Sequence, residues 1–163
     1  MATNLEFIKS ESADNVSSLT VTNIFSAKYD VYEIFVTGNG SQNTGSLTAQ
    51  FLDSSGTAIG LGSVQQAVQR LKYASAYDPI WGATNNAFEM VYSGAVDTDF
   101  GIKMTVYNPF SNSEFTYVGI QAISEHAAKG IVCIGSTTSA EQMKFYANQN
   151  YTPIKVSVYG VKD

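Results

Sequence analysis

The sequence predicts an all-β protein, an antiparallel two-sheet sandwich of jelly-roll-like type. Short runs in which apolar and polar residues alternate recur along the chain, and turn signals separate them. Strands without helical crossovers between them pair antiparallel, and an apolar sheet face needs a second sheet to cover it. With 163 residues, the chain suits a single β-sandwich domain over residues 1–163.

The segment before the first clear strand, residues 1–16, has two interpretations. It is polar and could serve as an arm that reaches a neighbouring protein. Alternatively, Leu5, Phe7 and Ile8 begin an edge strand of the sandwich. The sequence leaves both open.

A hairpin is expected in "TAQFLDSSGTAIG", Thr48 to Gly60. Leu47, Ala49 and Phe51 recur at the period of a strand on the way in. Asp53 to Gly56 then reverse the chain, because Asp and Ser side chains bond nearby backbone groups and Gly accepts positive φ.

Alternation also predicts the other strands. Val31–Thr37 has apolar residues on both faces and ends at "GNG", which is typical of a central strand. The windows Val64–Leu71 and Ser139–Gln142 also carry helical spacing, but both are short and flanked by strands, so we predict strand in both. Further strands are expected over Ser18–Phe25, Phe88–Tyr92, Ile102–Val106, Phe115–Ile123, Ile131–Ile134 and Ile154–Val158.

Composition favours a protein that binds other surfaces. Charged residues make up 14% of the chain, against about 25% in an ordinary domain, and ten residues are Tyr. A weakly charged, Tyr-rich surface suits packing against a neighbouring protein or a sugar. The other interpretation is that β-rich proteins simply use Tyr, Thr and Ser on their strands.

Several classes of partner are not expected. The net charge is −5 and the nine Lys and Arg are scattered, so the chain offers no cationic stripe for nucleic acid. No apolar run approaches the roughly 18 residues of a membrane span, and no basic leader indicates export. The lone Cys133 allows neither an internal disulfide nor a cysteine-based zinc site.

The sequence predicts that the protein is not an enzyme and that it has no catalytic residue, cofactor or metal. The single histidine, His126, lies among small and polar residues and is expected in a solvated loop. Asp97 and Asp99 lack the remaining ligands of a calcium loop. The Gly-rich stretch "TGNGSQNTG" lacks the Lys-Ser/Thr ending of a phosphate loop.

Binding is best indicated by "YASAYDPIWGATNN", Tyr73 to Asn86, which we expect to be a loop. Its candidate contact residues are Tyr77, Asp78, Trp81 and Asn85. Trp81 could plug one end of the core, anchor a subunit contact, or stack on a sugar ring while the polar groups bond its hydroxyls.

The C-terminal "AEQMKFYANQNYTPIKVSVYGVKD" reads as a strand at Met143, Phe145 and Tyr146, a polar turn, and a final strand through Tyr159 and Gly160. It is similar to the closing hairpin of small β-sandwich, jelly-roll-like virion proteins of tailed bacteriophages, especially of phages of marine bacteria. The N-terminal "MATNLEFIKSESADNVSSLTVTNIFSAKYDVYEIFV", followed by "FLDSSGTAIG", is similar to the same group.

The resemblance implies a virion structural protein assembled in the host cytoplasm. We expect a capsid decoration (cement) protein, whose partners are capsid proteins and copies of itself, in a homotrimer. The alternative is a tail-fibre or spike module that binds host surface glycan through Tyr77, Asp78 and Trp81. The resemblance brings no catalytic residues.

Overall fold

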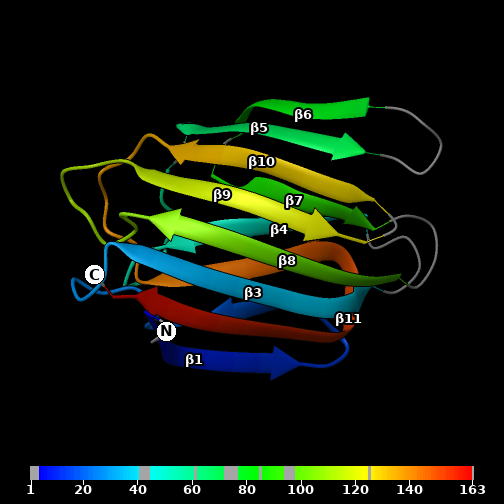
Figure 1. The fold of residues 1–163 in the computed structure, drawn as a ribbon, viewed down its shortest axis with the longest axis horizontal. Helices are drawn as coiled ribbons and strands as arrows, with labels where there is room; N and C mark the ends of the chain where they lie inside the picture. Colours follow the sequence, from blue (N-terminus) through cyan, green and yellow to red (C-terminus); the bar gives the residue numbers. More distant parts are fainter. Residues whose placement is uncertain are drawn as a thin grey trace.

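The computed structural model describes residues 4–40, 45–60, 62–71, 77–84, 86–93, 98–124 and 126–162, with backbone alone at 45, 77–84, 91–93 and 98. These residues form antiparallel strands in two layers (Figure 1). The strands are β1 Leu5–Ala13, β2 Val16–Val21, β3 Val31–Gly40, β4 Gly45–Leu52, β5 Val64–Leu71, β6 Tyr77–Thr84, β7 Phe88–Ser93, β8 Thr98–Tyr107, β9 Thr116–Ile123, β10 Ala127–Ile134 and β11 Gln142–Val161. Within the described part of the chain, no helix is long and apolar enough to cross a bilayer.

The two layers are sheets of unequal size. The larger sheet has the order β6-β5-β10-β9-β8-β3-β11-β1, and the smaller one has the order β2-β11-β4-β7. Every pairing among these strands is antiparallel. The predicted all-β, jelly-roll-like sandwich is therefore confirmed.

β11 belongs to both sheets, which corrects the predicted closing hairpin. Residues Gln142–Tyr146 pair with β2 and β4, whereas the part from Ile154 onward pairs with β3 and β1. The register shifts between Tyr146 and Ile154, so the polar residues expected to form a turn instead lie in one continuous strand that bends. Irregularities of this kind let a strand pass from one sheet of a sandwich to the other.

The core lies between the sheets and follows the predicted alternation. Tyr32, Ile34 and Val36 of β3 are fully buried, and this strand is central, as expected, between β8 and β11. Its other face carries the partly exposed Phe35, and the strand continues through the "GNG" segment that was predicted to end it. Other strands point the following residues into the same core: Ile102, Met104 and Val106 of β8; Ala49 and Phe51 of β4; Phe88 and Met90 of β7.

The reversal at Asp53–Gly56 forms as predicted. Asp53 Oδ1 accepts hydrogen bonds from the backbone N–H groups of Ser55 and Thr57, each at 2.9 Å, and Gly56 has φ of +82°. The Ser55 hydroxyl also donates to Asp53 Oδ1, at 2.6 Å, and this bond, followed by the backbone bonds, holds the pKa of the Asp53 carboxyl below its usual value. The returning arm is shorter than a strand, because it consists of a single bridge between Leu52 and Ala58.

Of the two ambiguous windows, only the first forms a strand. Val64–Leu71 is β5, in which Val64 and Val68 are buried while Gln65, Ala67 and Gln69 are exposed. The strand prediction for Ser139–Gln142 is wrong, because Ser139 and Ala140 bond to the carbonyls of Phe110 and Pro109 and only Gln142 belongs to β11. At the N-terminus, Leu5–Ala13 forms β1, as the edge-strand interpretation of that segment predicts.

Candidate binding surface

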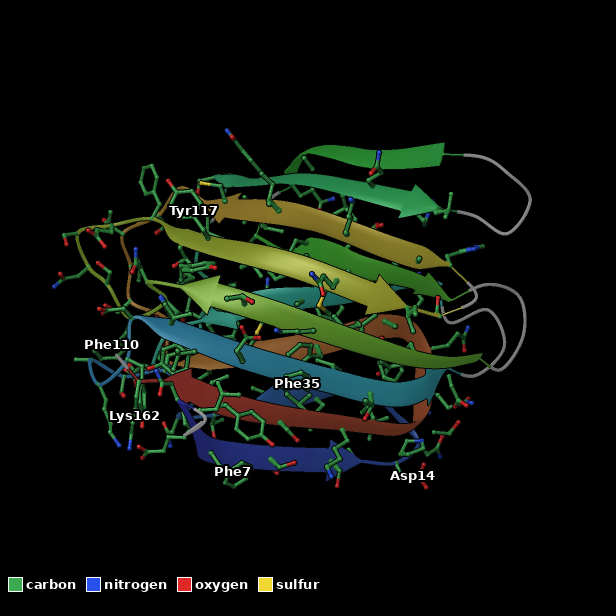
Figure 2. All side chains as sticks on the ribbon, viewed as in Figure 1. Phe7, Asp14, Phe35, Phe110, Tyr117 and Lys162 are labelled. Atoms are coloured by element: carbon green, nitrogen blue, oxygen red, sulfur yellow. The ribbon has the colours of Figure 1, made fainter. Side chains whose placement is uncertain are left out.

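The larger sheet turns one face away from the smaller sheet, and we call it the outer face. Of the described side chains, nine large apolar ones are exposed; eight of them lie on the outer face and the ninth, Phe115, directly precedes β9. Ile123 and Ile131 are the most exposed, at 66% and 68%. Figure 2 shows Phe7, Phe35 and Tyr117 spread over this face. The others are Leu5, Leu71 and Tyr107. Exposed apolar groups gathered on one face typically mark an interaction surface.

One end of the outer face carries three aromatic residues and a leucine, which we call the edge cluster: Leu5, Phe7, Phe35 and Tyr159. The Tyr159 ring lies 5.6 Å from the Phe7 ring and 5.8 Å from the Phe35 ring, both edge to face. Phe7 remains 59% exposed. Among the described strands, β1 pairs with β11 alone, so its other edge presents unpaired backbone N–H and C=O groups.

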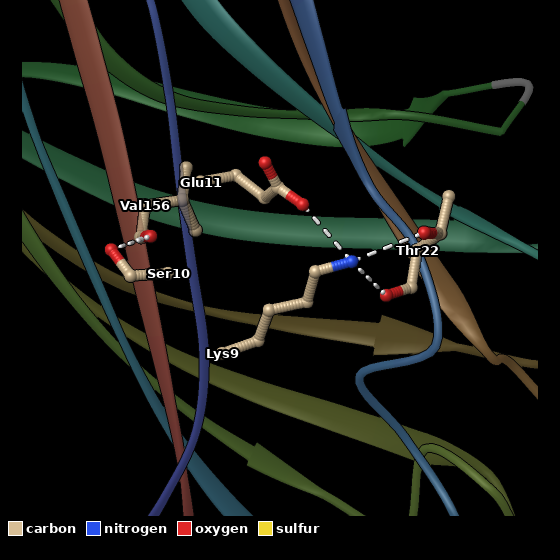
Figure 3. Close-up of polar contacts among 5 residues, drawn as sticks. All are labelled: Lys9, Ser10, Glu11, Thr22 and Val156. Atoms are coloured by element: carbon tan, nitrogen blue, oxygen red, sulfur yellow. Dashed lines mark hydrogen bonds and ion pairs between the residues drawn. The ribbon is translucent and has the colours of Figure 1, made fainter.

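Side-chain contacts hold β1 in place beneath the edge cluster. Ser10 Oγ donates to the Val156 carbonyl of β11 at 3.0 Å (Figure 3). Lys9 Nζ, also drawn there, donates to the Thr22 carbonyl at 3.0 Å and pairs with Glu11 Oε1 at 3.0 Å. β1 is thus attached to both β11 and the segment after β2.

Glu6 adds a second attachment of β1, near the C-terminus. Its Oε1 accepts from Lys28 Nζ at 2.6 Å, and its Oε2 lies 2.8 Å from Lys162 Nζ. Hydrogen bonds from Lys162 and Lys28 lower the pKa of Glu6 to about 2. The carboxylate is therefore ionised at neutral pH.

The middle of the outer face carries four polar side chains in a line, which we call the polar row: Lys103, Gln121, Lys129 and Gln69. They come from β8, β9, β10 and β5 and are direct partners in the three ladders. Directly paired residues of antiparallel strands share a face, and neighbouring strands are about 4.8 Å apart. The backbones of the two lysines are therefore about 10 Å apart.

A shallow hollow of about 450 Å³ lies along the polar row. Tyr107 and Ile131 also line it, and Gly119 contributes no side chain to its floor. A Cβ added at Gly119 would meet its first neighbour, a backbone oxygen, only at 4.0 Å, so the space above the backbone is open. Such a hollow exposes polar groups beside one aromatic ring.

The charges on the outer face differ from those of the whole chain. Lys103 Nζ lies 3.2 Å from Glu33 Oε2, and Thr105 Oγ1 donates to Glu33 Oε1 at 2.9 Å. Lys129 makes no ion pair or hydrogen bond with the described residues. Together with Lys155, the outer face carries three lysines and two carboxylates, those of Glu33 and Asp99. The outer face is thus slightly cationic on a chain with net charge −5.

The residues predicted from "YASAYDPIWGATNN" do not form a loop site. Tyr77, Asp78 and Trp81 lie in the edge strand β6, which pairs antiparallel with β5. Pro and Gly favour turns, which is why the segment predicts a loop, but an edge strand such as β6 also tolerates Pro. Asn85 lies outside the described residues. Tyr77 pairs with Leu71 and Trp81 with Ala67, which are outer-face positions, whereas Asp78 pairs with Arg70.

His126, Asp97 and Asp99 are not expected to form a catalytic or metal site. His126 lies in the connection between β9 and β10, where its carbonyl accepts the Ser124 N–H at 2.9 Å. Asp99 lies on β8 and accepts from Asn39 Nδ2 at 3.0 Å, while Asp97 lies outside the described residues. Within the part of the chain that the structure describes, no three His, Cys, Asp or Glu residues gather as a metal site would require.

Sequence reasoning missed the polar row. Its members lie on four strands, between residues 69 and 129, and no local pattern links them. Each is simply a polar residue on the exposed side of a strand. The row exists only once the strand order is known.

The fold defines the chain as an all-β protein of two packed antiparallel sheets, and comparisons with known proteins add no family. No family model and no curated protein matches the sequence. A sucrose-6-phosphate hydrolase from Lactobacillus gasseri is similar over 96% of this chain and 28% of its own, with 9% identity and a TM-score of 0.42. This chain therefore spans little more than a quarter of that enzyme.

Two other solved structures are comparably distant. An alginate lyase in complex with an alginate trisaccharide is 8% identical, over 89% of this chain and 81% of its own, with a TM-score of 0.35. The CBM2 module of an evolved Dit of Lactobacillus casei BL23 phage J-1 is 6% identical, over 90% and 70%, with a TM-score of 0.25. At these TM-scores the likeness carries no conclusion about activity or ligand.

Proposed function

We propose that the protein is a bacteriophage virion structural protein that acts by binding, and that it decorates the capsid by attaching to neighbouring capsid subunits. The observation that carries this proposal is the edge cluster, where Phe7, Tyr159 and Phe35 pack edge to face beside an open edge strand. Exposed aromatic rings held in a fixed geometry are typical anchors of protein interfaces. The resemblance of both chain ends to phage virion proteins supports the same class.

Attachment would work through burial of the edge cluster against a capsid subunit or another copy of the chain. The open edge of β1 offers backbone hydrogen bonds to an added strand, and Phe7 offers apolar area. A contact of about 1,600 Å² in total suffices for a stable interface. A homotrimer would repeat this contact around a three-fold axis, and assembly would take place in the host cytoplasm.

The test replaces Phe7 with Asp in the phage that encodes the protein. A buried carboxylate without a partner opposes association, so the Phe7→Asp chain should be lost from purified particles. Quantitative mass spectrometry and cryo-EM of wild-type particles should find many copies on the shell. Phe115→Asp, the same change at a comparably exposed Phe outside the edge cluster, should leave incorporation unchanged.

Both purified variants must show the wild-type circular dichroism spectrum and a thermal transition, so that misfolding is not mistaken for lost attachment. Full incorporation of Phe7→Asp, or particles that contain none of the wild-type chain, would overturn the proposal. Particles assembled without the protein should also break at lower temperature than wild-type particles.

The second candidate is a tail-fibre or spike module that binds host glycan. The pairing of Tyr77 and Trp81 with outer-face positions of β5 favours it, because both aromatic residues then border the exposed face. This function predicts few copies per particle, located on the tail. A Trp81→Ala phage would then adsorb poorly to its host although its particles contain the normal amount of protein.

A further inference from the structure

We propose that the polar row binds an anionic polysaccharide, with Lys103 and Lys129 contacting its carboxylate or sulfate groups. Lys103 of the row is the direct ladder partner of Phe35 in the edge cluster, so the two surfaces adjoin there. From Lys103 the row runs away from the edge cluster over β9, β10 and β5, so a particle-bound protein can keep Lys129 and Gln69 exposed while Phe7 is covered. This inference goes beyond the proposed function, and either can hold without the other.

Charge argues for an anionic occupant. Lys129 has no partner among the described residues, and Lys103 has only the contact to Glu33 at 3.2 Å. Cations are scarce in this chain, with nine Lys and Arg against fourteen Asp and Glu, yet two of them lie within one row. The same row on a second copy would repel it, which disfavours face-to-face self-association.

The order of the row argues for a repeating polymer. Lys, Gln, Lys and Gln alternate across four neighbouring strands, so the same pair of groups recurs about every 10 Å. A lysine supplies donors to an anion, and a glutamine amide both donates to and accepts from sugar hydroxyls. A polysaccharide presents anions and hydroxyls at a regular interval, whereas the surface of a folded protein has no such repeat.

The hollow beside the row fits a sugar chain in shape. Its volume of about 450 Å³ lies within the range of small-ligand sites. Gly119 leaves the backbone in the hollow uncovered, since an added Cβ there would meet its first neighbour only at 4.0 Å. Tyr107, which is 44% exposed, gives a ring on which a sugar can stack.

The test titrates the full chain with polygalacturonate, whose anions are carboxylates, and with heparin, which adds sulfates, using isothermal calorimetry. Dextran is the neutral control, and poly-L-glutamate represents an acidic protein. We expect binding to polygalacturonate or heparin, no binding to dextran, and weaker binding when salt rises from about 0.05 M to about 0.5 M, because salt screens exposed charges.

Variants locate the site. Lys129→Gln should weaken polysaccharide binding about two- to fivefold. Lys144→Gln removes the same charge from the part of β11 in the smaller sheet and should change nothing. Circular dichroism spectra and thermal transitions identical to wild type confirm that both variants fold.

No binding to either polyanion, or equal losses in the two variants, would overturn the inference. Equal or tighter binding of poly-L-glutamate would overturn it in favour of an acidic protein partner. Neither result bears on the proposed function, since incorporation of Phe7→Asp into particles decides that separately.

Discussion

Tyr32 and Tyr151 are both fully buried, but their hydroxyl groups have different surroundings. Tyr32 Oη donates to the Ser26 carbonyl and accepts from the Ser26 N–H, each at 2.8 Å. These two bonds attach the segment between β2 and β3 to the buried Tyr32. Tyr151 Oη has no hydrogen-bond partner among the described residues, although its ring packs against Phe100.

This contrast predicts opposite consequences for the same substitution. Tyr32→Phe should lower the free energy of unfolding by about 1–3 kcal/mol, because it removes two hydrogen bonds between the Tyr32 hydroxyl and the Ser26 backbone. Tyr151→Phe removes a hydroxyl that makes no bond, so the free energy should stay the same or rise by up to about 1 kcal/mol. Urea denaturation measures both values. A larger loss in Tyr151→Phe than in Tyr32→Phe would contradict this account.

At the scale of the element, the end of β11 shows why a glycine stands between Tyr159 and Val161. A Cβ added at Gly160 would lie 2.5 Å from ring atoms of Tyr29. That ring also packs edge to face on Tyr32, with 5.6 Å between ring centroids, so it has little freedom to move. The absent side chain lets the Tyr29 ring lie directly on the strand.

Gly160→Ala should therefore destabilise the protein by about 1–3 kcal/mol through overpacking. Gly101→Ala is the matched control, since it also lies in a strand of the larger sheet but has open space around the new Cβ. Gly101→Ala should leave the free energy of unfolding unchanged or raise it by a few tenths of a kcal/mol, because alanine lowers the entropy of the unfolded chain. Thermal denaturation of the two variants compares them directly, and equal effects would refute the role given to Tyr29.

At the scale of the whole molecule, β11 joins the two sheets. Phe145 and Ile154 are both fully buried and lie in different halves of β11. Phe145 pairs with β2 and β4 of the smaller sheet, and Ile154 pairs with β3 of the larger sheet. Because one continuous strand pairs with neighbours in both layers, neither sheet keeps all its pairings when the other opens.

We expect the two sheets to unfold as one unit. Phe145→Ala should remove about 3–5 kcal/mol of stability and Ile154→Ala about 2–5 kcal/mol. Each variant should speed hydrogen exchange in β8 and β9 of the larger sheet as much as in β4 of the smaller sheet, as measured by mass spectrometry or NMR. Faster exchange confined to the sheet that carries the substitution would show that the layers open independently.

Much of the fold could be predicted from local patterns. Alternation located β3, β5, β8, β9 and β10, since a half-buried strand repeats every two residues wherever it lies. Local patterns wrongly predicted a hairpin over residues 142–161 and a loop over residues 77–84, both of which form strands. A bending strand and a hairpin share the same alternation, and an edge strand that contains Pro and Gly resembles a loop.

The sequence by itself determined the all-β class, the buried side of most strands and the weakly charged, Tyr-rich composition, because these depend on residue type and short spacing. Tertiary structure alone decided the strand order, the passage of β11 between sheets and the assembly of the polar row. Those features depend on pairings between segments far apart in the chain, and backbone hydrogen bonds are the same for every partner. Core packing of the whole chain therefore selects among them.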